Sequence, residues 1–352
     1  MNIYKSDLWV ADIDLILTSL PDLSFLENSS ILITGAGGLI CSAIIDVLIR
    51  YNETHDKKIL LLVAGRDESK LRNRFFPYSE KSYFRSVLYD AGDRNVDIPI
   101  HADYIIHGAG NASPDKIIKE PVETMSSNFI GLLNLLEYAK KENTIRTLYI
   151  SSSEVYGSGM NTTPQNEKNY GYIDILNSRN SYSVGKRAAE TLCCSYTDEF
   201  QTDTVIVRPG HIYGPTASKN DIRVSSEWAY SAANGKDIVM KSKGLQIRSY
   251  VYCLDCATAI LIALLKGVTK CAYNISNADS IITIKQMGEL ISKLSKVEFK
   301  TELPTEDEIK GFNPMLNSSL DASSLSALGW KCFFNAEKGF SHTIQIIRQI
   351  TH

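Results

Sequence analysis

Residues 31–49 contain the feature that most constrains the fold, because a short apolar strand pattern runs directly into a glycine-rich turn and then into a helical apolar pattern. The strand covers residues 31–34, the turn reads GAGGLI over residues 35–40, and apolar helix positions follow over residues 44–49. Glycines let a backbone approach a pyrophosphate closely, and a helix N-terminus supplies N–H groups and a positive dipole. We therefore predict a dinucleotide site. The residues predicted to hold the cofactor in this turn are Gly35, Gly37, Gly38, Leu39 and Ile40.

Cys41 stands where a TGxxGxxG pattern would have its third glycine. A small residue at that position still permits close packing of the helix. The alternative is an ordinary strand-to-helix turn whose glycines serve geometry only.

Strand and helix patterns alternate along the first two thirds of the chain, which favours an α/β fold with a Rossmann-type, doubly wound parallel sheet. We predict an N-terminal helical extension over residues 1–28, with its helix ended by Pro21, an NAD(P)-binding Rossmann domain over 29–215, and a smaller mixed α/β substrate-binding lobe over 216–352. Residues of about 248–266 are expected to return to the core. The strands expected in the core cover residues 31–34, 59–64, 86–89, 104–107, a strand ending in Tyr149, and 204–208. The lobe is expected to contain helices at 228–234, 255–265, 283–296 and 336–350 and strands at 238–240 and 273–275.

The end of the second strand reads Gly65-Arg66-Asp67. An acidic residue there usually holds the ribose of NAD, whereas a small residue followed by arginine suits the 2′-phosphate of NADP. Arg66 therefore favours NADP, although Asp67 follows at once and Arg66 also suits a solvated surface position. Asp90, after the third strand, is either an acceptor for the adenine amino group or a loop carboxylate.

A second small-residue turn follows the strand at residues 104–107. We expect Gly108, Ala109 and Gly110 to pass beneath the cofactor. His107, inside the apolar strand, is interpreted as a core histidine rather than a catalyst.

Tyr182 and Lys186 are four residues apart in a helical pattern, so both side chains share one helix face. A neighbouring ammonium lowers the pKa of a phenol, which helps the phenol to exchange protons at neutral pH. Ser152 lies at the end of the strand that closes with Tyr149, where its hydroxyl can bond the same substrate oxygen. These three residues predict hydride chemistry at a carbinol carbon, against the alternative of a solvated helix turn.

Charge and composition exclude several classes of partner. The net charge of −3 gives no electrostatic basis for binding nucleic acid or an anionic membrane. We expect a cytoplasmic protein, because the N-terminus lacks a signal-peptide pattern and no apolar run is long enough to span a bilayer. Cys253 and Cys256 form the one CxxC pair and are interpreted as buried thiols, and we expect no metal site.

Taken together, these residues resemble the extended short-chain dehydrogenase/reductases of the NAD-dependent epimerase/dehydratase family, which modify nucleotide-diphosphate sugars. The resemblance covers roughly residues 30–350 and depends on the motifs TGAGGLI, NFIGLLNLLEYAK, SSSEVYG, YSVGK, RPGHIYGP and IRSYVYCLD. It implies that Tyr182 is the acid/base, that Lys186 binds the nicotinamide ribose, and that Ser152 orients the sugar hydroxyl. It also implies a tightly bound NAD and a homodimer formed through the helices at 122–140 and 182–200.

The resemblance assigns further residues to the two ligands. Pro209, Tyr182 and Lys186 join the cofactor site, and Arg248 matches the arginine placed on the sugar-nucleotide diphosphate. The remaining substrate-binding residues are Ser153, Arg179 and His211. Where the family has asparagine before its Tyr-Gly-Pro, this chain has His211, which departs from the pattern.

Within the family, SSSEVYG and RNSYSVGKRAAETL are most similar to UDP-glucuronate decarboxylases. The 4,6-dehydratases have Asp-Glu at the positions of Ser153 and Glu154, and their aspartate protonates the leaving hydroxyl, which a serine does less readily. We therefore expect oxidation of the sugar at C4 with bound NAD(P), and then decarboxylation, dehydration or epimerisation of the 4-keto sugar. Glu154 would select the second step; the alternative is a strand-end carboxylate bonded to backbone.

Two other functions stay open. The first is an NADPH-dependent reductase of a 4-keto nucleotide sugar, which Gly65 and Arg66 favour. The second is a catalytically silent, cofactor-binding regulator, against which the intact Ser152, Tyr182 and Lys186 argue.

Overall fold

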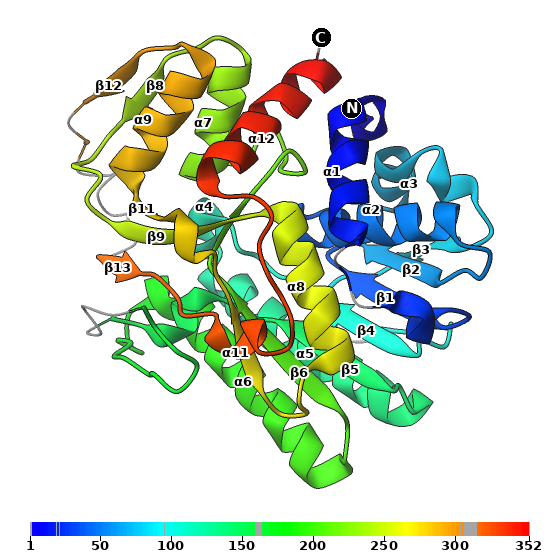
Figure 1. Cartoon of the computed structure of the whole chain (residues 1–352). Helices are drawn as coiled ribbons and strands as arrows, with labels where there is room; N and C mark the ends of the chain where they lie inside the picture. Colours follow the sequence, from blue (N-terminus) through cyan, green and yellow to red (C-terminus); the bar gives the residue numbers. More distant parts are fainter. Residues whose placement is uncertain are drawn as a thin grey trace.

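In the computed structural model, the described residues are 2–18, 20, 22–94, 96–158, 164–302, 304–305 and 315–351. Within them a seven-stranded parallel sheet forms the centre of the molecule, in the order β10-β6-β5-β4-β1-β2-β3 (Figure 1). The strands are β1 (Ser30–Thr34), β2 (Leu60–Gly65), β3 (Phe84–Leu88), β4 (Tyr104–His107), β5 (Arg146–Ile150), β6 (Thr204–Pro209) and β10 (Ala272–Ile275). This order confirms the predicted Rossmann-type, doubly wound α/β fold.

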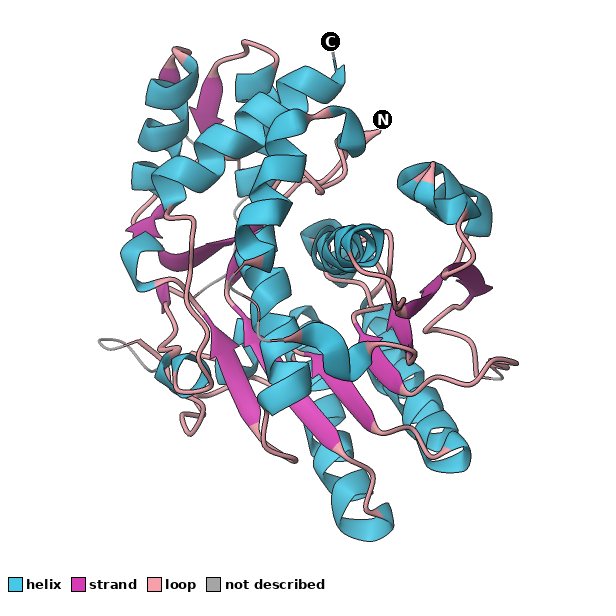
Figure 2. Ribbon diagram, turned by 45° about the vertical axis from the view of Figure 1, so that its right-hand side comes forward, coloured by secondary structure: helices cyan, strands magenta, loops and turns pink. Residues whose placement is uncertain are grey.

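Helices cover both faces of this sheet (Figure 2). On one face α2 (Leu39–Thr54) packs against α8 (Cys253–Lys266), and on the other α5 (Pro121–Glu142) lies along α6 (Ser181–Phe200). The central strands are mostly apolar, and β1 is buried at every position, as expected for a sheet covered on both sides. The helices α3 (Glu68–Phe75) and α4 (Pro114–Lys119) are short and were not predicted. A dimer through α5 and α6 stays a prediction.

The smaller lobe is built on a four-stranded sheet in which β9 (Ile247–Tyr252) pairs with β7 (His211–Tyr213), β11 (Ile281–Thr283) and β13 (Asn317–Ser318). A separate pair joins β8 (Ile238–Met240) to β12 (Phe299–Thr301). The lobe's larger helices are α7 (Val224–Ala233), α9 (Ile284–Ser295) and α12 (Ala336–Thr351), and a short helix, α11 (Ser323–Ser326), packs against β10.

One strand corrects the expected arrangement. We placed residues 273–275 in the smaller lobe, but β10 pairs with β6 and extends the central sheet. The reason is that α8 carries the chain back along the core, so the strand after it lies beside β6. The domain boundaries at 28 and 215 stay predictions.

The described part of the N-terminal segment, residues 2–18, 20 and 22–28, is packed against the rest of the protein. The helix α1 (Asp7–Leu17) contacts α2, α8 and α12, and its Trp9, Ile13 and Ile16 are buried. Its carboxylate Asp12 accepts hydrogen bonds from Tyr252 of β9 and His342 of α12. The N-terminal segment therefore joins the two lobes. The helix ends at Leu17, and Pro21, where we expected its end, lies outside the described residues.

The described residues also bear on two expectations, one about membrane-spanning segments and one about cysteines. No helix in these residues combines the length and apolar character needed to cross a membrane. Cys253 and Cys256 are both buried as free thiols, as interpreted from the sequence.

A buried ion pair holds the N-terminal segment, and we expect its loss to destabilise the fold strongly. Asp46 of α2 is fully buried, pairs with Arg74 at 2.7 Å and accepts a hydrogen bond from Tyr4 at 2.6 Å. Asp46→Ala would leave the Arg74 charge buried and unpaired, and should lower the free energy of unfolding by about 3–5 kcal/mol. Urea denaturation measures this change.

The matched control is Asp14→Ala. It removes an ion pair between Asp14 of α1 and Arg50 of α2, the helix that also carries Asp46. Its side chains are 45% and 36% exposed, and its loss should cost less than about 1 kcal/mol. Equal losses in the two variants would contradict the assignment of Asp46 as the anchor.

Candidate active site

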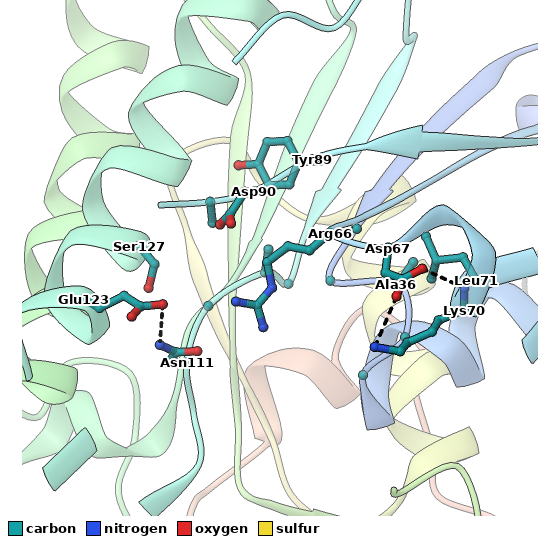
Figure 3. Close-up of a pocket in the computed structure, with 18 residues that line it drawn as sticks. Ala36, Arg66, Asp67, Lys70, Leu71, Tyr89, Asp90, Asn111, Glu123 and Ser127 are labelled. Carbon is teal, nitrogen blue, oxygen red and sulfur yellow. Dashed lines mark hydrogen bonds and ion pairs between the residues drawn. The ribbon is translucent and has the colours of Figure 1, made fainter. Parts of the chain in front are cut away.

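A cavity of about 430 Å³ lies outside the carboxyl ends of β1, β2 and β4 (Figure 3). Its walls include residues 35–38 after β1, 65–67 at the end of β2, and 108–111 after β4. β1 and β4 are adjacent in the sheet, and the chain winds outward in opposite directions from them, so this is the topological switch point where α/β sheets bind ligands. The register aligns Thr34 with Ala64 and His107, so these three strand ends lie along one edge of the sheet.

The two glycine turns are in direct backbone contact. Gly35 has φ +70°, and a Cβ there would lie 2.7 Å from the Gly108 backbone. A Cβ on Gly108 would collide with the Cys41 thiol. Cys41 therefore occupies the space behind the second turn, and a small residue at its position is compatible with close packing. These are the features that a dinucleotide pyrophosphate requires, so the residues present fit such a cofactor.

The helix α2 begins at this turn with Gly38 as its N-cap. The Ser42 amide donates a hydrogen bond to the Gly38 carbonyl, which is the first bond of the helix. The amides before Ser42 therefore have no partner within the helix. Their N–H groups and the helix dipole favour an anion at this end.

The predicted cofactor residues divide into two groups. Those that line the cavity are Gly35, Gly37, Gly38, Arg66, Asp90, Gly108, Ala109 and Gly110. Those that do not line it are Leu39, Ile40, Tyr182, Lys186 and Pro209. Pro209 is the buried last residue of β6, and Leu39 and Ile40 form the first turn of α2. All of these assignments stay predictions.

Ser152, Tyr182 and Lys186 meet beyond the carboxyl end of β5. Ser152 caps the short helix at Ser153–Tyr156, and its hydroxyl accepts the Glu154 amide at 3.2 Å. Tyr182 and Lys186 lie in the first two turns of α6, with the Lys186 Nζ 5.7 Å from the centre of the Tyr182 ring. The four-residue spacing therefore places the two side chains together, as expected.

The electrostatics of this cluster correct one expectation. We expected Lys186 to lower the pKa of the Tyr182 phenol, but burial and the Glu154 charge raise it to about 12, against the lowering effects of a Ser152 hydrogen bond and Arg223. The Lys186 ammonium donates instead to the Ile150 carbonyl at 2.8 Å. Burial also lowers the pKa of Lys186 to about 7, so in the free chain its ammonium loses a proton far more readily than an exposed lysine does.

Glu154 sits between the catalytic cluster and the predicted substrate residues. Its carboxylate accepts a hydrogen bond from Ser183 at 3.0 Å and lies 4.0 Å from Arg179. It also acts electrostatically on Tyr182 and on Arg248. The neighbouring Ser153 is buried at the start of the short helix.

Arg248 and His211 come from the paired strands β9 and β7. Arg248 is 3% exposed, and the hydrogen bond that its Nη1 makes is to the Ile247 carbonyl. Burial lowers its pKa, partly offset by Tyr250 and Glu154. The His211 Nδ1 is buried with no hydrogen-bond partner among the described residues, and burial with nearby Arg248 lowers its pKa to about 3. The imidazole is therefore neutral at physiological pH.

Arg223 is a residue of the site that the sequence did not reveal. It caps the start of α7, forms a bidentate pair with Asp221, and lowers the pKa of both Tyr182 and His211. Arg179 and Arg248 are other arginines near the cluster: Arg179 lies near Glu154, and the Arg248 Nη1 donates to a backbone carbonyl. An arginine preceding a helix was the available signal, and it is too common to be informative alone.

Comparison with known proteins finds a matching family profile and relatives over most of the chain. The profile of the NAD dependent epimerase/dehydratase family matches residues 31–276. UDP-glucuronic acid decarboxylase 6 of Arabidopsis thaliana is 30% identical over 309 residues, covering 87% of this chain and 85% of the relative. UDP-glucuronic acid decarboxylase 1 of Xenopus tropicalis is 28% identical over 345 residues, covering 94% and 75%.

Solved structures share the fold at lower identity. A mutant UDP-glucuronic acid 4-epimerase from Bacillus cereus, with a fluorinated UDP-glucuronic acid and NAD, has a TM-score of 0.78 at 20% identity and covers 91% of this chain and 99% of its own. A dTDP-glucose 4,6-dehydratase from Bacillus anthracis, in complex with NAD, has a TM-score of 0.72 at 20% identity, covering 90% and 96%.

The opposing effects on Tyr182 can be separated by titration. Glu154→Gln removes a negative charge and should lower the pKa of the Tyr182 phenol, whereas Ser152→Ala removes a hydrogen bond that favours tyrosinate and should raise it. NMR of ring-labelled tyrosine follows the onset of ionisation, with the signal assigned by Tyr182→Phe.

Glu123→Gln is the control, because Glu123 lines the cavity but is not among the groups that shift Tyr182. A shift in the same direction for Glu154→Gln and Ser152→Ala would contradict this account of the cluster.

Proposed function

The chain belongs to the NAD dependent epimerase/dehydratase family, and from this premise we propose that it modifies the sugar of a nucleotide-diphosphate sugar. In the proposed reaction the sugar is oxidised at C4 to a 4-keto sugar, the 4-keto sugar is decarboxylated as in a UDP-glucuronate decarboxylase, and the hydride then returns to C4, so that no cofactor is consumed. The observation that carries the proposal is the proximity of Ser152, Tyr182 and Lys186 to one another, with the Glu154 carboxylate acting on both Tyr182 and the buried Arg248.

The cofactor would be held by the two glycine turns and the start of α2, with Lys186 on its ribose. When bound, an oxidised nicotinamide dinucleotide would accept the hydride from C4 of the sugar and would add positive charge to the site. Tyr182 is the proposed base for the C4 hydroxyl proton, and Ser152 is proposed to orient that hydroxyl. In the free chain the phenol is protonated at neutral pH because its pKa is raised to about 12, so proton uptake requires more positive charge near the ring than Lys186 supplies there.

The positive charge on the substrate side supports a sugar that carries an anionic group of its own. Arg248 is proposed to bind the diphosphate, and Arg179 and Ser153 the sugar. The 4-keto group accepts, as an enolate, the electron pair released when the bond from C5 to the carboxylate breaks, so the carboxylate leaves as carbon dioxide without a protonated leaving hydroxyl. C5 then takes up a proton. The chain has serine rather than aspartate at position 153, which favours this route over elimination.

The second candidate is an NADPH-dependent reductase of a 4-keto nucleotide sugar. It is favoured by Arg66, whose side chain lines the cavity at the end of β2. This reaction uses the same Ser152 and Tyr182, with Tyr182 donating a proton to the C4 oxygen. The two candidates differ in whether the cofactor is consumed.

We expect the purified protein to convert UDP-glucuronate, and not dTDP-glucose, without net consumption of cofactor. Products are identified by mass spectrometry with no cofactor, NAD⁺ or NADP⁺ added. Carbon dioxide release with a UDP-pentose supports decarboxylation. Failure to convert either sugar, together with stoichiometric NADPH oxidation on a 4-keto sugar, would replace the first candidate by the second. A chain that turns over neither kind of sugar would be a silent binding protein.

Tyr182→Phe should lower kcat by about 10²–10⁴-fold, because it removes the proposed acid/base group without changing the ring. Tyr196→Phe is the matched control on the same helix, since its hydroxyl bonds Glu137 away from the cluster. Glu154→Gln should retain C4 oxidation and release more 4-keto sugar, as measured by trapping with borohydride. If Tyr182→Phe and Tyr196→Phe lose activity equally, the proposed role of Tyr182 is wrong.

A further inference from the structure

Two cations line the wall of the cavity: Arg66, which directly follows β2, and Lys70, in the first turn of α3. The Arg66 side chain is exposed and makes no hydrogen bond or ion pair with any residue that the structure describes. Figure 3 shows its guanidinium directed into the cavity, away from the strand that carries it. An unpaired guanidinium in such a position is suited to a phosphate, which it can bind through two parallel hydrogen bonds.

Asp67 occupies the position from which an acidic residue would hold the ribose of NAD, but its carboxylate is already engaged. Its Oδ1 accepts the Lys70 amide at 3.0 Å and caps α3, and its Oδ2 lies 3.1 Å from the Lys70 Nζ (Figure 3). These contacts hold the pKa of Asp67 below its usual value. Both oxygens therefore serve the helix that follows, and binding a ribose hydroxyl would compete with the cap.

The other nearby carboxylates are also placed elsewhere. Glu68 accepts the Ser86 hydroxyl at 2.7 Å and so faces β3. Asp90 lines the cavity from the end of β3 and accepts the Gly92 amide at 2.9 Å. Glu123 lies across the cavity on α5, 3.4 Å from the Asn111 amide nitrogen. At the end of β2 itself the available charge is thus positive.

We infer that Arg66 and Lys70 form a subsite for the 2′-phosphate of an NADP-type dinucleotide. The inference rests on the proposed function, because it assumes that the cavity binds a nicotinamide dinucleotide. In this subsite Arg66 binds the phosphate directly, and Lys70 neutralises Asp67, so that the carboxylate does not repel the phosphate. Several solved neighbours are described as complexes with NAD, so the inference separates this chain from them in cofactor choice.

Isothermal titration calorimetry with NADP⁺ and NAD⁺ tests the inference, with adenosine 2′,5′-bisphosphate and 5′-AMP as probes that lack the nicotinamide. We expect the wild type to bind the 2′-phosphorylated member of each pair at least about tenfold more tightly. Arg66→Ala should lower the affinity for NADP⁺ by about tenfold or more and change that for NAD⁺ by less than about twofold.

Lys70→Ala should weaken NADP⁺ binding and strengthen NAD⁺ binding, because it releases one oxygen of Asp67. Arg72→Ala is the matched control: Arg72 is on the same helix, lies 4.0 Å from Glu80 and does not line the cavity. It should leave both affinities unchanged, and circular dichroism checks that each variant is folded.

The outcomes distinguish this inference from the proposed function. Tight binding of NAD⁺ with no preference for the 2′-phosphate, or an equal loss for both dinucleotides in Arg66→Ala, overturns the subsite and leaves the sugar chemistry standing. Binding of neither dinucleotide overturns both. Because the readout is affinity, a failure to turn over a particular sugar does not affect it.

Discussion

The contact between the backbones of Gly35 and Gly108 determines where every other part of the site lies. It closes the gap between adjacent strands at the switch point, where a side chain on either residue would collide with the opposite turn or with Cys41. Below it, the Thr34 hydroxyl lies 2.7 Å from the His107 Nδ1, which joins the two strand ends. Burial lowers the pKa of His107 to about 3, so the ring remains a neutral part of the core. The cavity is lined by both turns, and the candidate cluster lies beside it in the sheet, with Ser152 following the next strand, β5, and Tyr182 and Lys186 on α6.

A second constraint is the burial of charge around that cluster. Tyr182, Lys186 and Arg248 are all buried, and burial shifts the pKa of each toward its neutral form. Burying an ionised group is costly unless it is paired. In the free chain Lys186 is stabilised by a carbonyl and Arg248 by the carbonyl of its own neighbour. Lys186 and Arg248 are therefore suited to anionic ligands, because a negative charge beside them would offset the free-energy cost of burying their positive charges.

The sequence predicted the parts of this structure that depend on local pattern. All six core strands expected before residue 210 are present, and so are the helices α5 and α6. Each has an apolar pattern of the appropriate period, bounded by turn residues. Three properties were beyond reach because they depend on tertiary contacts. The position of β10 depends on how α8 returns, the proximity of Arg223 depends on a loop from the other lobe, and the direction of the Tyr182 pKa shift depends on burial. The spacing of Tyr182 and Lys186 predicted that they meet, but not that Lys186 would bond a backbone carbonyl.

The position of Glu154 bears on which second step the cleft can support. Elimination requires a proton donor for the departing hydroxyl, and a carboxylic acid is the usual one. Glu154 is instead surrounded by the Ser183 hydroxyl and Arg179, which are partners for a carboxylate. Its charge also helps to raise the pKa of the Tyr182 phenol, which is therefore neutral at physiological pH in the free chain. Decarboxylation, the second step that we propose, needs no proton for a leaving hydroxyl. The contacts of Glu154 therefore support that proposal over loss of water, for a reason independent of the serine at position 153.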